Sequence, residues 1–202
     1  VLMDGVVRYR PELLIGASGY QSVSDIKRHR QELNDYIRHA AMYHDLGKNF
    51  MISVVNNDYR PTTDHEFAII KKHPEFGLRF LAGDSTFQKY HDTTLGHHKW
   101  YNGKAGYPAW FDNTQSPRRV MIDIITLCDC MQAATERLGR NYKGEKQFET
   151  LLEEFKRDAG TRYNPKLVSL LERHPDVTRK MKRLVIDGWL NVYFNIYHKF
   201  FR

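Results

Sequence analysis

The sequence predicts an all-α fold in which several helices form one bundle. Apolar residues recur every three or four positions through most of the chain, which is the period of an amphipathic helix. No alternating run of apolar and polar residues indicates a strand. With 202 residues, 41% of them hydrophobic and 13% aromatic, the chain is long and apolar enough to bury a sizeable core.

The first expected segment, residues 1–23, has turn chemistry. Pro11, Gly16 and Gly19 predict a loop, which would follow the end of a helix whose start lies before Val1. The chain also opens without an initiator Met. We therefore interpret residues 1–23 as a loop and the remnant of a truncated upstream helix, and the chain as a fragment of a longer protein.

The next two segments carry the helical pattern. Residues 24–44 have an apolar stripe near the 3.6-residue period, with Ser24 as a candidate N-cap. Gly47 lies just beyond the stripe, where a helix would stop. Residues 64–82 predict two short helices, because Pro74 interrupts the pattern.

Three helices are expected in the second half. Residues 117–138 are the most apolar, so this helix should run through the core. Residues 145–158 and 164–173 predict two shorter helices, separated by turn chemistry at Gly160 and Pro165.

The tail, residues 174–202, has an aromatic stripe at helical spacing and basic residues at both ends. One interpretation is an amphipathic helix that docks on the domain or on a second subunit. The other is a helix that lies on a membrane surface. The polar face is not uniformly basic, which favours the docked or dimerising helix. The expected organisation is thus residues 1–23, a main domain at 24–173, and this tail.

Composition limits the partners and the compartment. The formal net charge of +7 suits an anionic partner such as a nucleotide. No basic stripe with interleaved aromatics appears outside the tail, so we expect no stable nucleic-acid complex. Two cysteines, Cys128 and Cys130, exclude a disulfide framework. Without an apolar run of membrane-spanning length or a signal peptide, we expect a cytoplasmic domain, with any membrane anchor elsewhere in the full-length protein.

Histidines and aspartates gather in separated clusters that suggest metal chemistry. They are His44 with Asp45, His73, His97 with His98, and Asp129 inside the most apolar helix. Imidazole nitrogens and carboxylate oxygens are the ligands that divalent Mn, Fe, Zn and Ni accept. Two alternatives remain open from the residues alone: the paired histidines could be unrelated side chains at a fraying helix end, and Asp129 could pair with an arginine.

The order of these clusters resembles the HD-GYP branch of the HD metal-dependent phosphohydrolases. The pieces that match are "HDLGK" at 44–48, "HPEFG" at 73–77, "HHKWYNGKAGYP" at 97–108 and "LCDCMQAAT" at 127–135. "GTRYNPKLV" at 160–168 is similar to the entry into the family's closing helix. The resemblance implies an HD-domain helical bundle, with the metal site between core helices, over about residues 36–172.

The resemblance also implies roles for single residues. His44 and Asp45 would bind metal, with Asp45 bridging two ions. His73, His97 and His98 would hold the second ion, and Asp129 would complete the shell of the first. The resemblance implies two divalent transition-metal ions, with Fe, Mn, Zn and Ni as the candidates.

Substrate contacts follow in part from the resemblance and in part from charge. The resemblance implies that Lys48 faces the scissile phosphate, as a catalytic residue together with Asp45, and that Gly106, Tyr107 and Pro108 shape the mouth of the site. Phosphodiesters are anionic, so the basic side chains after the apolar helix are candidate phosphate contacts. These are Arg137, Arg140 and Lys143, which could equally be solvated surface residues.

The implied function is hydrolysis of cyclic di-GMP to linear pGpG or GMP in bacterial second-messenger signalling. A cyclic dinucleotide would be the substrate, with a regulatory or GGDEF-type domain upstream in the full-length chain and a homodimer as further partners. Two alternatives are an HD phosphohydrolase that acts on another nucleotide or phosphate ester, and a degenerate HD module for signalling or dimerisation. The chain departs from the family pattern at Gln132 and Asn102, where aspartate is usual, and it shows no upstream histidine ligand.

Overall fold

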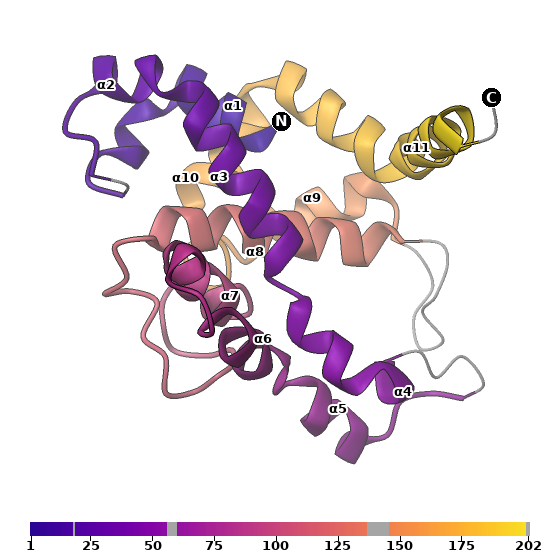
Figure 1. Cartoon of the computed structure of the whole chain (residues 1–202). Helices are drawn as coiled ribbons and strands as arrows, with labels where there is room; N and C mark the ends of the chain where they lie inside the picture. Colours follow the sequence, from indigo (N-terminus) through magenta and orange to yellow (C-terminus); the bar gives the residue numbers. More distant parts are fainter. Residues whose placement is uncertain (18, 56–59, 137–145, 201–202) are drawn as a thin grey trace.

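The computed structural model describes residues 1–17, 19–55, 60–136 and 146–200. These residues form helices and no named strand, so the all-α prediction is confirmed (Figure 1). In chain order the elements are α1 (Leu2–Tyr9), η1 (Pro11–Leu14), α2 (Val23–Arg28), α3 (Arg30–Tyr43), η2 (Leu46–Met51), α4 (Ile52–Val55), α5 (Asp64–Ile70), α6 (His73–Leu81), η3 (Ser85–Tyr90), α7 (His91–Gly96), α8 (Arg119–Thr135), α9 (Phe148–Arg157), α10 (Pro165–Arg173) and α11 (Pro175–Phe200), where η denotes a 3-10 helix.

Helix α8 runs through the middle of the molecule, as its composition predicts (Figure 1). Its buried side chains Met121, Ile124 and Leu127 lie in a core built with α1, α3, α9, α10 and the first turns of α11. Ile125, on another face of α8, joins a smaller cluster with Ala40 of α3. A helix that is apolar on several sides can bury all of them only by lying between other elements.

The first 23 residues contain more structure than a loop. Helix α1 buries Leu2, Met3, Val6 and Val7 in the main core. Its last residue, Tyr9, stacks on His174 with the ring centroids 3.7 Å apart. Eight residues span barely two helical turns, which is too short for the apolar period to be recognised in the sequence. Helix α1 is therefore an integral part of the bundle.

The predicted helix at residues 24–44 is divided into α2 and α3. Ser22, not Ser24, caps α2, because the Ser22 hydroxyl accepts a hydrogen bond from the Asp25 backbone N–H. The break at residues 64–82 also lies slightly earlier than Pro74. Pro74 stands in the first turn of α6, where its missing N–H costs nothing.

Helix α11 is the longest element, and its two halves differ. Val177 and Met181 are buried in the main core, with Val185 and Ile186 packed against it. Beyond these residues the helix extends away from the bundle (Figure 1). In the part of the chain that the structure describes, no helix is both long enough and apolar enough to cross a bilayer.

Candidate metal centre

The six side chains with predicted metal-binding roles converge from four parts of the chain. His44 and Asp45 follow α3, His73 begins α6, His97 and His98 follow α7, and Asp129 lies on α8. Their potential ligand atoms form two groups, each with its atoms within 4.8 Å of one another. One group contains Asp45, His73, His97 and His98, and the other contains His44, Asp45 and Asp129. Asp45 belongs to both groups.

Close backbone packing holds the η2 segment against α6. A Cβ atom added to Gly47 would lie 1.8 Å from the His73 carbonyl oxygen and 2.6 Å from the Gly77 nitrogen. Only glycine permits this approach. The sequence suggested Gly47 as a helix stop, but α3 already ends at Tyr43. The role of Gly47 is instead to bring Asp45 beside His73.

Three of the histidines are oriented in the same way. The Nδ1 atoms of His44, His73 and His97 each lie 2.7 Å from the carbonyl oxygen of the residue three positions earlier, Ala41, Ile70 and Thr94 respectively. A carbonyl can only accept a hydrogen bond, so each Nδ1 carries the proton and donates it. The Nε2 atom of each ring is then a lone-pair donor that faces the centre, which is the arrangement seen in metal-binding histidines.

The Nε2 atoms that face the centre bring several lone pairs close together. His73 Nε2 lies 3.0 Å from His97 Nε2 and 3.1 Å from Asp45 Oδ1. When both Nδ1 atoms are protonated, these are acceptors opposite acceptors, which repel unless a cation or an added proton lies between them. Consistent with this, His44 Nε2 and Asp45 Oδ1 are buried without a hydrogen-bond partner in the described residues. The arrangement therefore fits divalent cations.

Asp129 completes the second group of ligand atoms. Its Oδ1 lies 3.8 Å from His44 Nε2, and its Oδ2 lies 4.0 Å from His98 Nδ1. The alternative of an arginine partner finds no support, since the ion-pair neighbours that the structure gives for Asp129 in the described residues are these two histidines. A buried carboxylate surrounded by imidazoles is a typical metal ligand.

Burial and the contacts between histidines and carboxylates shift the pKa values of the candidate ligands in opposite directions. Burial alone would lower the pKa of His44, but Asp129 and Asp45 overcome it and raise the pKa to about 9. Burial lowers the pKa of His97 to about 4 and holds that of His98 well below its ordinary value. For Asp45, burial would raise the pKa, but the neighbouring imidazoles of His44, His73 and His97 outweigh it and lower the pKa. At neutral pH the centre thus holds the Asp45 carboxylate and neutral imidazoles at His97 and His98, the forms that bind metal, whereas His44 carries a proton that an incoming cation would displace.

The Gly-Tyr-Pro loop lies directly on the histidines. The Tyr107 ring centroid is 4.5 Å from that of His98 and 6.1 Å from that of His73. Gly106 has φ +89°, and a Cβ there would meet the His98 carbonyl oxygen at 2.1 Å. Gly106 thus allows the loop to lie against the His98 backbone, and Tyr107, joined to Pro108 by a cis peptide bond, forms one wall of the centre.

Lys48 lies on η2 with its ammonium group 2.6 Å from Asp45 Oδ2. This lysine therefore stands beside the residue that both ligand groups share. A cation at this position can contact an anionic group bound at the centre.

The remaining predicted contacts, Arg137, Arg140 and Lys143, lie outside the described residues. The structure brings another cation to this region that the sequence did not suggest. Arg162 donates a hydrogen bond from Nη2 to the Cys130 sulfur at 3.4 Å, one residue from Asp129. The Arg162 carbonyl accepts from the Tyr101 N–H at 3.0 Å, which joins its turn to the loop after the paired histidines. Only this long-range contact places Arg162 near the centre.

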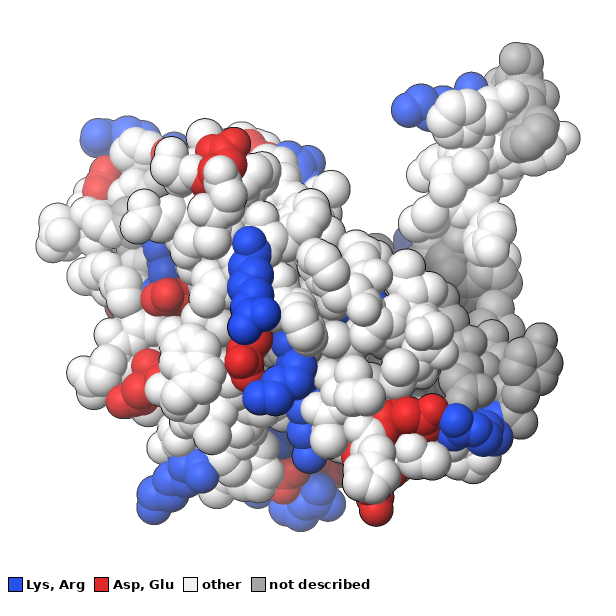
Figure 2. Space-filling view, turned by 60° about the horizontal axis from the view of Figure 1, so that its bottom comes forward, with Lys and Arg blue, Asp and Glu red and all other residues white. Residues whose placement is uncertain are grey.

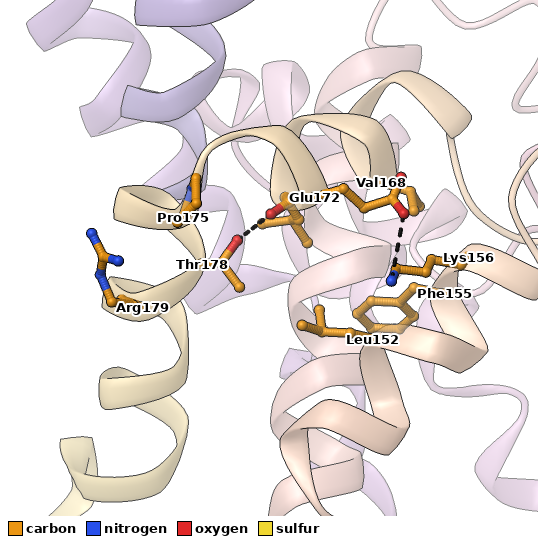
Figure 3. A pocket seen from close by; sticks show the side chains of 9 residues that line it. Leu152, Phe155, Lys156, Val168, Glu172, Pro175, Thr178 and Arg179 are labelled. Atoms are coloured by element: carbon orange, nitrogen blue, oxygen red, sulfur yellow. Dashed lines mark hydrogen bonds and ion pairs between the residues drawn. The ribbon is translucent and has the colours of Figure 1, made fainter.

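A separate groove opens between α9, α10 and the start of α11 (Figure 3). Leu152, Phe155 and Val168 form its apolar side, and Lys156 pairs with Glu172 across it at 3.6 Å. None of its lining residues belongs to the metal-binding groups. We therefore place the functional site at the histidine cluster, and not in this groove.

Comparison with known proteins relates the chain to phosphodiesterases. No family model matches the chain. The chain is 28% identical over 144 residues to a 3'3'-cGAMP-specific phosphodiesterase of Vibrio cholerae, and 28% identical over 150 residues to a cyclic di-GMP phosphodiesterase of Thermotoga maritima. It is 30% identical over 105 residues to a cyclic di-GMP phosphodiesterase of Pseudomonas aeruginosa.

These alignments cover 70%, 73% and 52% of this chain, but only 27%, 39% and 24% of the respective relatives. The chain is thus similar to one part of each longer protein. Fold and site define a helical domain with His and Asp groups that could bind metal. The similarity to three proteins that are named as cyclic dinucleotide phosphodiesterases agrees with the resemblance that the ordered His and Asp motifs predict.

Proposed function

We propose that the chain is a metal-dependent phosphodiesterase that hydrolyses a cyclic dinucleotide, cyclic di-GMP first, to linear pGpG or GMP. The observation that supports it most is the set of facing acceptors, with His73 Nε2 3.0 Å from His97 Nε2 and 3.1 Å from Asp45 Oδ1. Facing acceptor atoms repel one another, so they do not stabilise the fold by themselves, and a bound cation would remove the repulsion. The names of the three relatives point to the substrate class.

The proposed cofactors are two divalent transition-metal ions, chosen from Fe, Mn, Zn and Ni. His73, His97 and His98 would hold one, His44 and Asp129 the other, and Asp45 would contact both. When bound, such ions lower the pKa of a water molecule and stabilise charge on the attacking and leaving oxygens of a phosphodiester.

Side chains near the metal centre would bind the phosphates, supply a proton and restrict access to the centre. Lys48 would neutralise a phosphate oxygen and supply a proton to the leaving oxygen, because its ammonium group already lies beside Asp45. Tyr107 would restrict access to the centre from the side of His98. Arg162 would add positive charge beside α8 and contact the second phosphate of the cyclic dinucleotide. Arg137, Arg140 or Lys143 would add further phosphate contacts.

The other hypotheses remain as outcomes of the test. The relative from Vibrio cholerae is named for 3'3'-cGAMP, so this substrate is the first alternative. Another nucleotide or phosphate ester is the second, and a degenerate HD module for signalling or dimerisation is the third. A regulatory or GGDEF-type domain joined to this chain stays a prediction.

The test is an assay of the purified chain with cyclic di-GMP and with 3'3'-cGAMP, in the presence of Mn²⁺ or Fe²⁺. We expect linear product from cyclic di-GMP, and its loss in the His98→Ala variant. The matched control is His65→Ala, since His65 is exposed on α5 and belongs to neither ligand group. Turnover of other phosphate esters alone would favour the second alternative.

Metal content provides an independent measurement. Elemental analysis of the purified chain should find a transition metal, with less in His98→Ala than in His65→Ala. A chain that contains no metal and resists reconstitution would overturn the enzymatic proposal.

A further inference from the structure

The outer half of α11 exposes an unusual amount of apolar surface. Seven large apolar side chains in this half are about half exposed or more, between 49% for Ile196 and 69% for Tyr193. They are Leu190, Val192, Tyr193, Phe194, Ile196, Tyr197 and Phe200. In Figure 2 a column of mostly white atoms, which belong to neither acidic nor basic residues, stands away from the body of the molecule. We call residues 187–200 the α11 arm.

The arm has one wide apolar sector and one narrow polar strip. At about 100° per residue, Asp187, Asn191, Asn195 and His198 lie on one strip of the helix. The apolar side chains fill the remaining roughly 200° of the circumference. A helix of this pattern normally buries its apolar side against another element. Among the residues that the structure describes, the main core covers α11 as far as Val185 and Ile186.

The charge of the arm argues against a lipid surface as the occupant. Helices that lie on membranes carry Lys and Arg along the polar face, which attract anionic headgroups. Here the polar strip holds Asp187, two asparagines and His198, with Lys199 at its edge. Its net charge is close to zero, so it offers an acidic membrane little attraction.

The area of the arm fits a second copy of the same chain. A large aromatic or aliphatic side chain that is about half exposed offers roughly 100 Å² for burial, so the seven together offer about 700 Å² per copy. A standard protein interface buries about 800 Å² on each partner. A two-fold pair also presents the same patch from both sides, so an apolar, uncharged sector is complementary to itself.

We propose that the chain forms a homodimer in which the α11 arms of two copies pack together through this apolar sector. The interface is independent of the proposed enzymatic function, since the arm contains no residue of the metal centre. Two-fold pairing of the arms would hold two catalytic domains on either side of a short helical stem.

The test is the mass of the whole chain in solution, by light scattering and sedimentation over a wide range of protein concentration. We expect twice the monomer mass of 23.9 kDa. The variant Leu190→Glu with Ile196→Glu places two charges on the apolar sector and should give a monomer. The matched control, Asn191→Glu with Asn195→Glu, adds the same charge to the polar strip and should stay a dimer.

Circular dichroism separates loss of pairing from loss of folding. The Leu190/Ile196 variant should keep the helical signal of the domain, because the arm lies beyond the residues that pack on the core. The proposal is overturned if the unmodified chain is a monomer throughout, or if both double variants remain dimers. Co-sedimentation of a monomeric chain with phosphatidylcholine and phosphatidylserine vesicles would identify a lipid surface as the occupant instead.

Discussion

The metal centre and the α11 arm depart from the usual pattern of burial in opposite directions. The centre buries His73 and His97 completely, and the arm leaves Phe194 and Phe200 about two thirds exposed. Buried polar groups need partners, and exposed apolar surfaces of this size usually mark a contact. In both regions the described residues present a surface that fits a partner: the His and Asp groups could hold cations, and the arm is the surface that we propose pairs with a second copy of the chain.

The largest expected effect is at Asp45, which both ligand groups share. Asp45→Asn removes the negative charge that the two sites would use, so turnover of the cyclic dinucleotide should fall by about 100-fold or more, since even outer-shell changes at metal sites cost 10- to 100-fold. Metal content and turnover should fall together. Unchanged metal content would show that Asp45 is not the shared ligand.

Large side chains in the main core and in the arm should also respond differently to truncation. Phe155 is fully buried and Phe194 is 63% exposed. Phe155→Ala should lower the free energy of unfolding by about 3–5 kcal/mol through lost burial and a new cavity. Phe194→Ala should leave the unfolding of a monomer nearly unchanged. Urea unfolding of both variants at low protein concentration provides the measurement, and equal losses would contradict the division between core and arm.

The next effect concerns the loop over the metal centre. Gly106→Ala should destabilise the chain by about 2–4 kcal/mol, because positive φ is unfavourable for alanine and the new methyl group would overlap the His98 carbonyl. Gly16→Ala is the matched control, since Gly16 has φ +78° with no atom within 4 Å of an added Cβ. Strain alone should cost the control about 1 kcal/mol. Thermal unfolding distinguishes the two, and equal shifts would mean that the contact with His98 is dispensable.

The smallest effect tests a buried carboxylate without imidazoles around it. Asp123 accepts a hydrogen bond from the Asn164 side chain at 2.8 Å, and burial raises its pKa to about 6. A raised folded-state pKa stabilises the fold below the ordinary value of 3.8, and this contribution is lost as the pH rises through about 6.

Asp123→Asn should therefore be more stable than the parent chain at pH 8, by about 2 kcal/mol, and similar to it at pH 4. Unfolding curves at the two pH values measure the difference. A gain that is the same at both would show that the ionisation of Asp123 is not its cause.

Much of the fold and of the site could be predicted from sequence because the signals were periodic or ordered. Helix α8 can be recognised from its apolar residues. The candidate metal ligands follow the order that the sequence motifs share with a known family: His44, Asp45, His73, His97, His98 and Asp129. Short elements could not be recognised. Helix α7 has six residues and η2 forms a 3-10 helix of six, too few turns for a period to appear.

By itself, the sequence determined the helical class, the main core helix and the His and Asp residues that gather at the candidate metal centre, because side-chain type and spacing along the chain are local properties. Only the tertiary structure decided which atoms face one another. It directs three Nδ1–H groups to backbone carbonyls, places Asp45 in both groups of candidate ligand atoms, and brings Arg162 to Cys130, the residue after Asp129. It also leaves the large apolar side chains of the α11 arm about half exposed or more. A periodic pattern shows that a helix has an apolar side, but distances between residues far apart in the chain depend on how the helices pack, and packing is a property of the whole fold.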